Sequence, residues 1–298
     1  MTRKFLITFI LMLIFSGICL ASAGSSSFAF LRLGSGSRPA ALAEAVTASG
    51  VDITSAFYNP ALLNSFDGKN QVVFMHNSYF SDVTENYLAL ASRGEQAAMG
   101  GYLILGKVSD FERRTGPDPE PSGTFDENNF VGALTYTRGI DNIDLGVTFK
   151  YAFEKIDYAS ASAVMFDLGL YMPLTDEISV GGAVKNIGTK PKFQRDAFEL
   201  PREIRVGTAY KPNYFQQRLV FLGDGVFYPD IDTKFNLGAE YTLGQYYALR
   251  AGYGAGYDSR GLSFGGGLFY RQFKFDYAFV NYKNDLGNAH RFTLVATF

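Results

Sequence analysis

The chain has 298 residues and a formal net charge of only −2, with 19% charged residues, 16% aromatic residues and 32 glycines. A charge this balanced gives no support to a nucleic-acid binder or to a protein that an electrostatic attraction holds on a membrane surface. Many aromatic residues and glycines with few charges are unusual for a soluble enzyme of this length, and indicate β-sheet with an apolar exterior.

Residues 1–23 have the pattern of a secretory signal peptide. Arg3 and Lys4 form the positive start, an apolar run continues to Leu20, and an A-x-A cleavage site follows at 21–23. A transmembrane anchor is the alternative, since the run approaches the length that spans a bilayer, but no stop-transfer pattern follows. Cys19, the only cysteine, lies inside this segment, so the mature chain is predicted to contain no disulfide.

Residues 24–69 are predicted to form a compact N-terminal plug. Within them, 38–66 is the only stretch of the presumed mature chain that reads as helix, and its many alanines suit close packing in a confined space. Gly50 and the Asn59-Pro60 step interrupt this pattern, because the residue before a proline is disfavoured in a helix. A barrel that leaves a lumen would need such a filler.

From residue 70 onward, apolar and polar residues alternate with the period of a β-strand. In NIDLGVTFKYAF, at 142–153, the apolar residues fall on one face, and Asn, Asp, Gly, Thr and Lys fall on the other. Segments of about ten residues with this alternation are typical of transmembrane β-barrels. A soluble β-sandwich also alternates, but its polar face is usually rich in charge, whereas this one is rich in Gly, Ser and Thr.

The pattern therefore predicts an all-β membrane protein whose residues 70–298 form a 14-stranded antiparallel transmembrane β-barrel. The predicted strands are 70–80, 85–93, 96–106, 127–138, 142–154, 162–172, 177–187, 202–211, 217–227, 234–243, 246–255, 261–271, 273–283 and 290–298.

The predicted connections are short at one end of this barrel and mostly longer at the other. The longest are the third, at 107–126, and the seventh, at 187–200. Short periplasmic turns and longer extracellular loops are the asymmetry of outer-membrane barrels, so the sequence predicts the outer membrane as the location. Phe298 adds a terminal aromatic residue on an alternating strand, which we interpret as a signal for the outer-membrane barrel assembly machinery.

Charged residues on the polar strand face are predicted to lie in the lumen. Both signs occur, so they are expected to pair with one another and with the plug, since charges persist in a low-dielectric lumen only when paired or hydrated. A selectivity filter is the alternative interpretation. The set comprises Lys150, Lys185, Arg205, Arg250, Arg271, Lys274, Arg291, Asp144, Asp167, Glu203, Asp224, Glu240 and Asp276.

Nothing in the sequence supports an enzyme, a metal site or a cofactor. His76 and His290 are the only histidines, and neither a nucleophile elbow nor a phosphate-binding loop is present. His76 is expected in the lumen or at its rim. The glycines at 252–256 and 265–267 are interpreted as strand glycines that allow curvature or close approach. The proline-rich third loop is either solvated or an element that binds a partner.

The plug segment resembles the N-terminal motif of the PorV/PorQ family of outer-membrane proteins, a branch of the FadL-like barrel superfamily. The family pattern runs from G-x-R-x-x-A-L, through an aspartate, to two aromatic residues and Asn-Pro-Ala. This chain departs from it at Ala43-Glu44, where two glycines are usual, and at Leu62, where one is usual. The matching residues are Gly36, Arg38, Ala41, Leu42, Asp52, Ala56, Phe57, Tyr58, Asn59, Pro60 and Ala61.

This resemblance implies two different functions. PorV-like and PorQ-like proteins are accessory components of type IX secretion, which implies secreted cargo or surface-attachment proteins as partners. FadL-like barrels pass long-chain fatty acids or other hydrophobic compounds through a plugged lumen, which implies hydrophobic small molecules as ligands. The mixed-charge lumen and compact loops favour the secretion role. In both cases Arg38, Asp52, Tyr58, Asn59, Pro60 and Ala61 are expected to hold or gate the plug.

Overall fold

The computed structural model describes residues 27–79, 83–114, 116, 120–193, 196–284 and 286–298. The predicted signal peptide at 1–23 therefore lies outside the described residues. None of the helices in the described part of the chain is long and apolar enough to cross a membrane.

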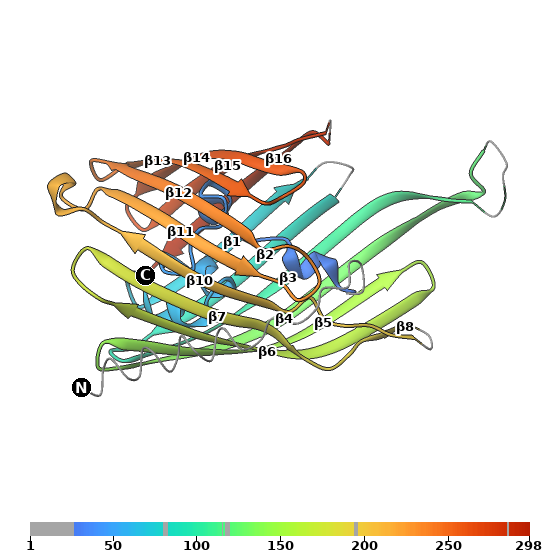
Figure 1. The fold of residues 1–298 in the computed structure, drawn as a ribbon, viewed down its shortest axis with the longest axis horizontal. Helices are drawn as coiled ribbons and strands as arrows, with labels where there is room; N and C mark the ends of the chain where they lie inside the picture. The colour runs from blue at the N-terminus through green and yellow to red at the C-terminus, as the bar shows by residue number, and fades with distance from the viewer. Residues whose placement is uncertain (1–26, 80–82, 115, 117–119, 194–195, 285) are drawn as a thin grey trace.

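Fourteen antiparallel strands close into a barrel, which confirms the predicted fold class (Figure 1). Every strand pairs with its neighbours in sequence, except that β7 pairs with β10 across the small β8–β9 hairpin, and β16 pairs with β1. The barrel strands are β1 (Asn70–Ser78), β2 (Val83–Arg93), β3 (Ala97–Arg113), β4 (Gly123–Ile140), β5 (Ile143–Ile156), β6 (Ala159–Pro173), β7 (Ile178–Gly188), β10 (Glu203–Tyr210), β11 (Leu219–Phe227), β12 (Lys234–Leu243), β13 (Tyr247–Ala255), β14 (Arg260–Tyr270), β15 (Phe273–Tyr282) and β16 (Asn288–Thr297).

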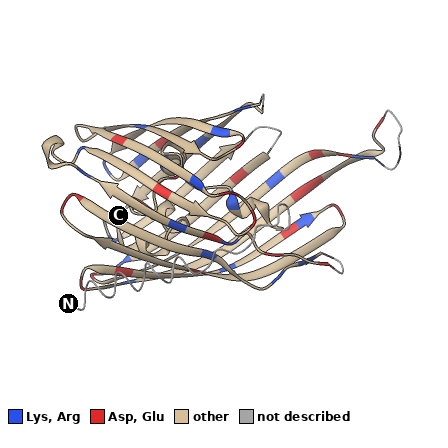
Figure 2. Cartoon of the chain, viewed as in Figure 1, with Lys and Arg blue, Asp and Glu red and all other residues tan. Residues whose placement is uncertain are grey.

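Burial alternates along the strands as the sequence pattern predicts. In β5, the side chains of Leu145, Val147 and Phe149 are exposed on the outer wall, whereas Thr148 and Lys150 between them are buried in the interior. Large apolar side chains are exposed around the whole outer wall, from Val72 in β1 to Leu294 in β16. Charged residues are sparse along the strands, and both signs are interspersed (Figure 2). An apolar exterior around a polar interior is the arrangement of a transmembrane barrel.

The two ends of the barrel differ in their connections. We call one of them the short-turn end. Its connections are 94–96, 141–142, 174–177, 211–218, 244–246 and 271–272. The opposite long-loop end carries the 14-residue connection between β7 and β10, which contains β8 (Lys192–Phe193) and β9 (Asp196–Ala197), but also a two-residue turn between β5 and β6. The predicted alternation of lengths therefore holds for most connections and fails at 157–158 and at the eight-residue connection 211–218.

The third predicted loop, at 107–126, is mostly strand. After an irregularity in pairing beyond Val108, β3 and β4 continue together until Arg113 pairs with Gly123. Stacked rings of Phe111 and Phe125, whose centroids are 5.4 Å apart, stabilise the extension. The result is a two-stranded ribbon, formed by 108–113 and 123–126, that projects beyond the rest of the long-loop end (Figure 1).

The plug fills the interior of the barrel but contains less helix than predicted. Only α2 (Ser37–Ala41) is an α-helix, and the other helical elements are the 3₁₀ turns η1 (Ala29–Arg32), η2 (Ile53–Phe57) and η3 (Pro60–Asn64). Short helices are unstable alone, so their stability must come from packing. Every residue of α2 and η2 is buried, and α2 contacts β13 to β16 while η3 contacts β3 to β6.

Candidate functional site: the plug and the lumen wall

Glycines on the lumen face let the plug backbone approach the wall closely. A Cβ atom built on Gly146 would lie 2.3 Å from the carbonyl carbon of Pro60, and one on Gly181 would lie 2.1 Å from the carbonyl oxygen of Thr47. Gly252, in the segment predicted to contain strand glycines, leaves room for the backbone of Ala43 in the same way. Backbone contacts this close are possible only where the strand residue has no side chain.

Asn59 connects the two halves of the plug to the wall. Its side-chain amide donates to the carbonyl oxygens of Thr47, at 2.8 Å, and of Leu170 in β6, at 2.9 Å. Its Oδ1 accepts from the backbone N–H of Ala61, which caps η3, while Pro60 occupies the first position of this turn. The Asn-Pro-Ala step of the motif is thus a fixed point between barrel and plug.

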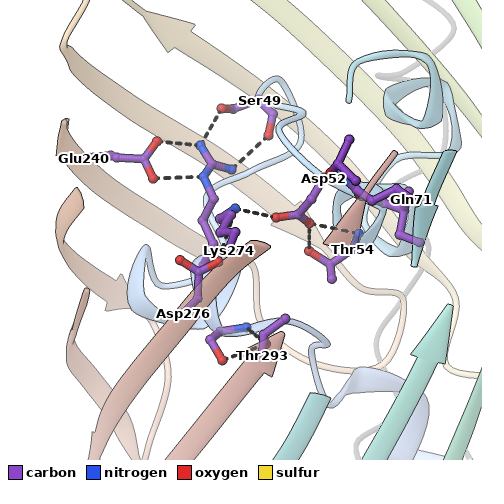
Figure 3. Close-up of polar contacts among 12 residues, drawn as sticks. Ser49, Asp52, Thr54, Gln71, Glu240, Lys274, Asp276 and Thr293 are labelled. Atoms are coloured by element: carbon purple, nitrogen blue, oxygen red, sulfur yellow. Dashed lines mark hydrogen bonds and ion pairs between the residues drawn. The ribbon is translucent and has the colours of Figure 1, made fainter. Parts of the chain in front are cut away.

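Arg38 begins a chain of alternating charges that links α2 to the wall (Figure 3). Its guanidinium donates to both carboxylate oxygens of Glu240, at 2.9 and 3.0 Å, and also to the backbone and side chain of Ser49. Glu240 also accepts from Arg250, at 2.5 Å, and Arg250 donates to Asp276, at 2.6 Å. A guanidinium that donates two hydrogen bonds to one carboxylate, as Arg38 does to Glu240, forms one of the strongest kinds of ion pair in proteins.

Lys274 completes this chain by joining the wall to the second part of the plug. Its Nζ lies 3.1 Å from Asp276 and 2.7 Å from Oδ2 of Asp52. The six groups therefore alternate in sign and sum to zero: Arg38, Glu240, Arg250, Asp276, Lys274 and Asp52. We call this set the charge chain.

Asp52 is ionised because its partners outweigh its burial. Burial alone raises the pKa of this carboxyl, but the charge of Lys274 and hydrogen bonds from Lys274 and Thr54 bring the pKa down to about 2. Asp52 also caps η2 by accepting from the backbone N–H of Thr54 at 3.0 Å.

A second polar network holds the turn between α2 and η2. Arg205 in β10 donates to Glu203, at 2.8 Å, to Asp224, at 3.2 Å, and to the hydroxyl of Thr47, at 3.0 Å. Asp224 in turn accepts from the backbone N–H of Thr47 at 3.0 Å. The guanidinium of Arg205 lies 5.1 Å from the ring centroid of Tyr58, so the motif tyrosine contacts the same network.

Ala43 and Glu44 keep the left-handed backbone that favours glycine. Their φ angles are 51° and 65°, in the region where a Cβ atom costs roughly 1 kcal/mol per residue. Contacts from the wall hold Glu44 there: Arg260 donates to its carboxylate at 2.6 Å, and Arg205 donates to its carbonyl oxygen at 2.6 Å. The turn at Ala43 and Glu44 is thus one that two glycines would form without strain. Leu62, the other departure, is buried in η3.

Three other predicted lumen charges, Lys150, Asp167 and Lys185, lie in pairs, and Lys185 shares Glu203 with the Arg205 network. Lys150 lies 2.7 Å from Asp167, and both side chains are almost fully buried. Lys185 lies 4.2 Å from the ring centroid of Phe57, with Glu203 at 3.9 Å.

Two more predicted lumen charges bond near the plug. Asp144, near the short-turn end, accepts from the plug residue Asn64 at 2.9 Å. Arg291 donates to the hydroxyl of Tyr79 at 2.6 Å.

Arg271 is not a lumen residue, and its prediction is wrong. The strand ends at Tyr270, and Arg271 turns with φ of 54° into the exposed connection between β14 and β15. His76, expected in or near the lumen, instead faces outward and bonds to Asn86. Phe298 follows β16 with an exposed side chain, and its backbone pairs with Asn70 at the start of β1.

The lumen wall opposite the charge chain carries an apolar cluster beside buried polar residues such as Glu85, Lys150 and Asp167. One buried cluster contains plug residues such as Phe57 and Phe66, together with wall residues mainly from β1 to β6. The wall residues from these strands are Val73, Met75, Tyr87, Ala89, Ala91, Ala98, Tyr102, Ile104, Val131, Ala133, Ala152, Ala161, Ala163 and Met165. Many are alanines, so the apolar contact between plug and wall is broad and lacks large interlocking side chains.

An aromatic group continues this cluster at the long-loop end. Phe28 of the plug packs against Phe30, at a centroid distance of 5.6 Å, and against Phe193 of β8, at 6.3 Å. Phe193 also packs against Phe198 in an edge-on contact at 6.0 Å. The apolar contact between plug and wall thus extends from the loop between β7 and β10 to Ala91 and Ala98 near the short-turn end.

Several residues of the site escaped sequence reasoning. Arg260, Ser263 and Glu85 all face the lumen. Ser263 accepts a hydrogen bond from the backbone N–H of Ala43, and Arg260 donates to the carboxylate of Glu44. The alternation pattern contained the signal, since Ser263 and Glu85 share the face of the predicted lumen charges. Within the described residues, no group of three or more His, Cys, Asp or Glu side chains is placed to hold a metal ion.

Solved structures share this fold, and three of them are compared below. The chain is similar to the CymD monoaromatic hydrocarbon channel, with 13% identity, a TM-score of 0.69 and coverage of 89% of this chain and 98% of that one. It is similar to the P. putida toluene transporter TodX, with 13% identity, a TM-score of 0.66 and coverage of 87% and 98%. A Pseudomonas aeruginosa FadL homologue gives 12% identity, a TM-score of 0.58 and coverage of 88% and 97%.

These structural neighbours are FadL-type 14-stranded barrels, and at such low identity the likeness concerns the fold alone. No protein-family model matches the sequence. No curated protein sequence matches it either.

Proposed function

We propose that the protein is an outer-membrane channel for small hydrophobic compounds, such as monoaromatic hydrocarbons or long-chain fatty acids. The observation that carries this proposal is the apolar contact between plug and wall, which is continuous from Phe193 at the long-loop end to Ala98 near the short-turn end. A hydrophobic solute that parts these surfaces has side chains of the apolar cluster beside it along this route.

The attachment of the plug is asymmetric in a way that suits this route. Within the described residues, four ion pairs join plug and barrel, and their barrel partners all lie between Asp230 and Lys274. On the opposite side, the described plug and β1 to β6 share no ion pair, and their contact combines the apolar cluster with hydrogen bonds such as those from Asn59 to Leu170 and from Thr137 to Pro60. The plug can therefore remain anchored on one side while its other side yields to a solute, without the separation of a buried ion pair.

The fold supports the same direction. Two of the similar structures are described as channels or transporters for monoaromatic hydrocarbons or toluene. The aromatic group of Phe28, Phe193 and Phe198 offers such a solute its first apolar contact at the long-loop end. Phe111 and Phe125 stack on the projecting ribbon instead, so they lie outside this group.

The test is uptake by whole cells, in which the outer membrane is the barrier. Deletion of the gene is expected to slow the uptake of labelled toluene and oleate, and the unchanged gene to restore it. Ala133→Phe, which places a ring in the apolar contact, is expected to restore uptake poorly. Leu134→Phe, on the outer wall, is the matched control and should restore uptake fully. Unchanged uptake after deletion would refute the proposal.

A PorV/PorQ-type role in type IX secretion is the second candidate. Its partners would be secreted cargo or surface-attachment proteins. The observation in its favour is the ribbon of 108–113 and 123–126, which projects beyond the long-loop end as an accessible contact element (Figure 1). Loss of surface-attached proteins in the deletion strain, with normal uptake of toluene and oleate, would select this role over transport.

Both functions require the same location and two partners. The apolar outer wall requires outer-membrane lipid around it, and assembly would use the barrel assembly machinery through the strand that ends at Phe298. A soluble fraction rich in the folded protein would contradict this location.

A further inference from the structure

The outer wall carries a depression of about 520 Å³ across β13 to β16 and β1. Its large lining side chains face away from the lumen: Leu249 is 58% exposed and Phe292 is 54% exposed. The volume is in the range of roughly 300–1,000 Å³ that small-molecule sites in proteins have. We call this depression the wall groove.

The wall groove exists because one outward position has no side chain. Gly266 in β14 faces outward between its cross-strand partners, Leu249 in β13 and Tyr277 in β15. A Cβ atom built on Gly266 would lie 3.6 Å from its nearest neighbour, the carbonyl oxygen of Ala248. This glycine is therefore not required for close approach of backbones, unlike Gly181 or Gly252 on the lumen face.

The wall groove lies towards the short-turn end. Tyr247 is the first residue of β13, and Leu268 pairs with Phe275 near the turn that joins β14 to β15. That turn exposes Arg271, three residues after Leu268, with its guanidinium over the ring of Tyr270. Two residues of strand beyond Leu268 span roughly 7 Å, so Arg271 lies close beyond this end of the groove.

We propose that the wall groove binds one phospholipid of the periplasmic leaflet, with an acyl chain in the groove and its phosphate at Arg271. The apolar lining faces the hydrocarbon region of the membrane, which supplies the chain. Arg271 supplies the charge that a phosphate needs, at the short-turn end where the headgroup of a periplasmic lipid lies.

The shape of the groove favours a lipid chain over another barrel. The outer wall of a second copy is convex and would bridge the depression, which would leave unfilled space in the contact, whereas a flexible chain fills it. The proposal requires the barrel to lie in a membrane and is independent of whether it transports hydrophobic compounds.

The chain contains no tryptophan, so a single introduced tryptophan reports on one place. Phe275→Trp puts the reporter in the wall groove, and Phe235→Trp puts it on the outer wall outside the groove, at nearly equal exposure of 50% and 54% for the replaced residues. The folded full barrel in maltoside micelles is titrated with phosphatidylglycerol that carries brominated chains, which quench tryptophan fluorescence on contact.

Quenching at position 275 is expected to saturate at about one lipid per barrel, whereas quenching at 235 should rise only with the lipid fraction of the micelle. Gly266→Leu fills the groove and should raise the lipid concentration for half-quenching at 275 by about tenfold or more. Arg271→Gln should raise it as well with the phospholipid, and should have no effect with a brominated fatty alcohol, which lacks a phosphate.

Gly223→Leu, at an outward glycine of β11 with similar room, is the matched control and should leave the titration unchanged. Equal titrations at 275 and 235, or no response to Gly266→Leu, would overturn the proposal. A change of Gly266→Leu from dimer to monomer, with no change in quenching, would also overturn it, because the occupant would then be a second copy.

Discussion

At the scale of single residues, the charge chain accounts for the charged members of the plug motif. Arg38 and Asp52 are its two ends, and each is paired with a residue of the second half of the barrel. Sequence periodicity placed Glu240 and Lys274 in the lumen, and the family resemblance singled out Arg38 and Asp52. Neither signal predicted which residues would pair, because the partners are 202 and 222 residues apart in the chain.

Acid should weaken the attachment of the plug at Asp52. The pKa of this carboxyl is about 2 in the folded protein, against an ordinary value of 3.8 for a free aspartate. A lowered pKa stabilises the folded state above the free value, by roughly 2 kcal/mol here, and this contribution is lost as the pH falls from about 4 to 2. We expect the ion conductance of the protein in planar bilayers to rise over this interval.

Asp52→Asn removes the titrating group at this position, so its conductance should rise less between pH 4 and pH 2. Glu199→Gln, in an exposed pair with Lys190, is the control and should behave as the unchanged protein. Identical curves for Asp52→Asn and the unchanged protein would show that this carboxylate does not hold the plug.

At the scale of elements, period-two alternation predicted the strands well, because one face of each strand is apolar and the other is not. It failed where that contrast disappears. In the ribbon of 108–113 and 123–126 both faces are accessible, so the pattern shows no alternation although the backbone remains paired. It also failed at Arg271, where the alternation continues one residue beyond the end of the strand.

The sequence predicted which segment forms the plug, but it did not predict the secondary structure of that segment. Its alanines suggested helix, but contacts with the wall decide the path of a segment this short. Asn59 and Thr47, which lie outside the helical turns, use backbone or side-chain polar groups to bond the wall, and several short turns have more such free ends than one continuous α-helix. The tertiary contacts of the plug therefore outweigh the intrinsic helix preference of its alanines.

Neighbouring glycines of β7 allow a matched test of the plug contact. Gly181 faces the lumen, where a Cβ would lie 2.1 Å from the carbonyl oxygen of Thr47. Gly182 faces the outer side, where a Cβ would lie 3.7 Å from its nearest neighbour, the carbonyl oxygen of Arg205. Gly181→Ala should displace the plug at a cost of roughly 1–3 kcal/mol, and Gly182→Ala should not. The measurement is cleavage of the folded barrel by chymotrypsin after Tyr58, which is 1% exposed.

A fragment beginning at Asn59 is expected from Gly181→Ala at protease concentrations that leave the unchanged protein and Gly182→Ala intact. Equal resistance of the two variants would mean that the plug adapts to a methyl group at this contact.

At the scale of the whole molecule, closure of the barrel requires the pairing of its first and last strands. β1 and β16 pair from Gln71–Thr297 to Ser78–His290, so no strand has a free edge along the wall. Closed barrels resist unfolding by detergent at low temperature, since every strand must separate from two neighbours.

The folded protein should therefore be heat-modifiable. In sodium dodecyl sulfate, an unboiled sample is expected to migrate as a compact barrel and a boiled sample as an unfolded chain of 32.8 kDa or, after removal of residues 1–23, slightly less. A reducing agent should make no difference, because the only cysteine lies in the predicted signal peptide. Equal mobility before and after boiling would contradict a closed barrel.

The asymmetric attachment of the plug also implies an order in which its contacts form during synthesis of the protein. Ser37, Arg38 and Asp52 are synthesised before any strand, yet their partners Thr293, Glu240 and Lys274 are among the last third of the chain to be made. The plug must therefore wait, with its charges unpaired, until the second half of the wall arrives. A chain truncated before β12 keeps the contacts of η3 with β3 to β6 but lacks the partners of Arg38 and Asp52, so a fully attached plug requires synthesis of the last strands.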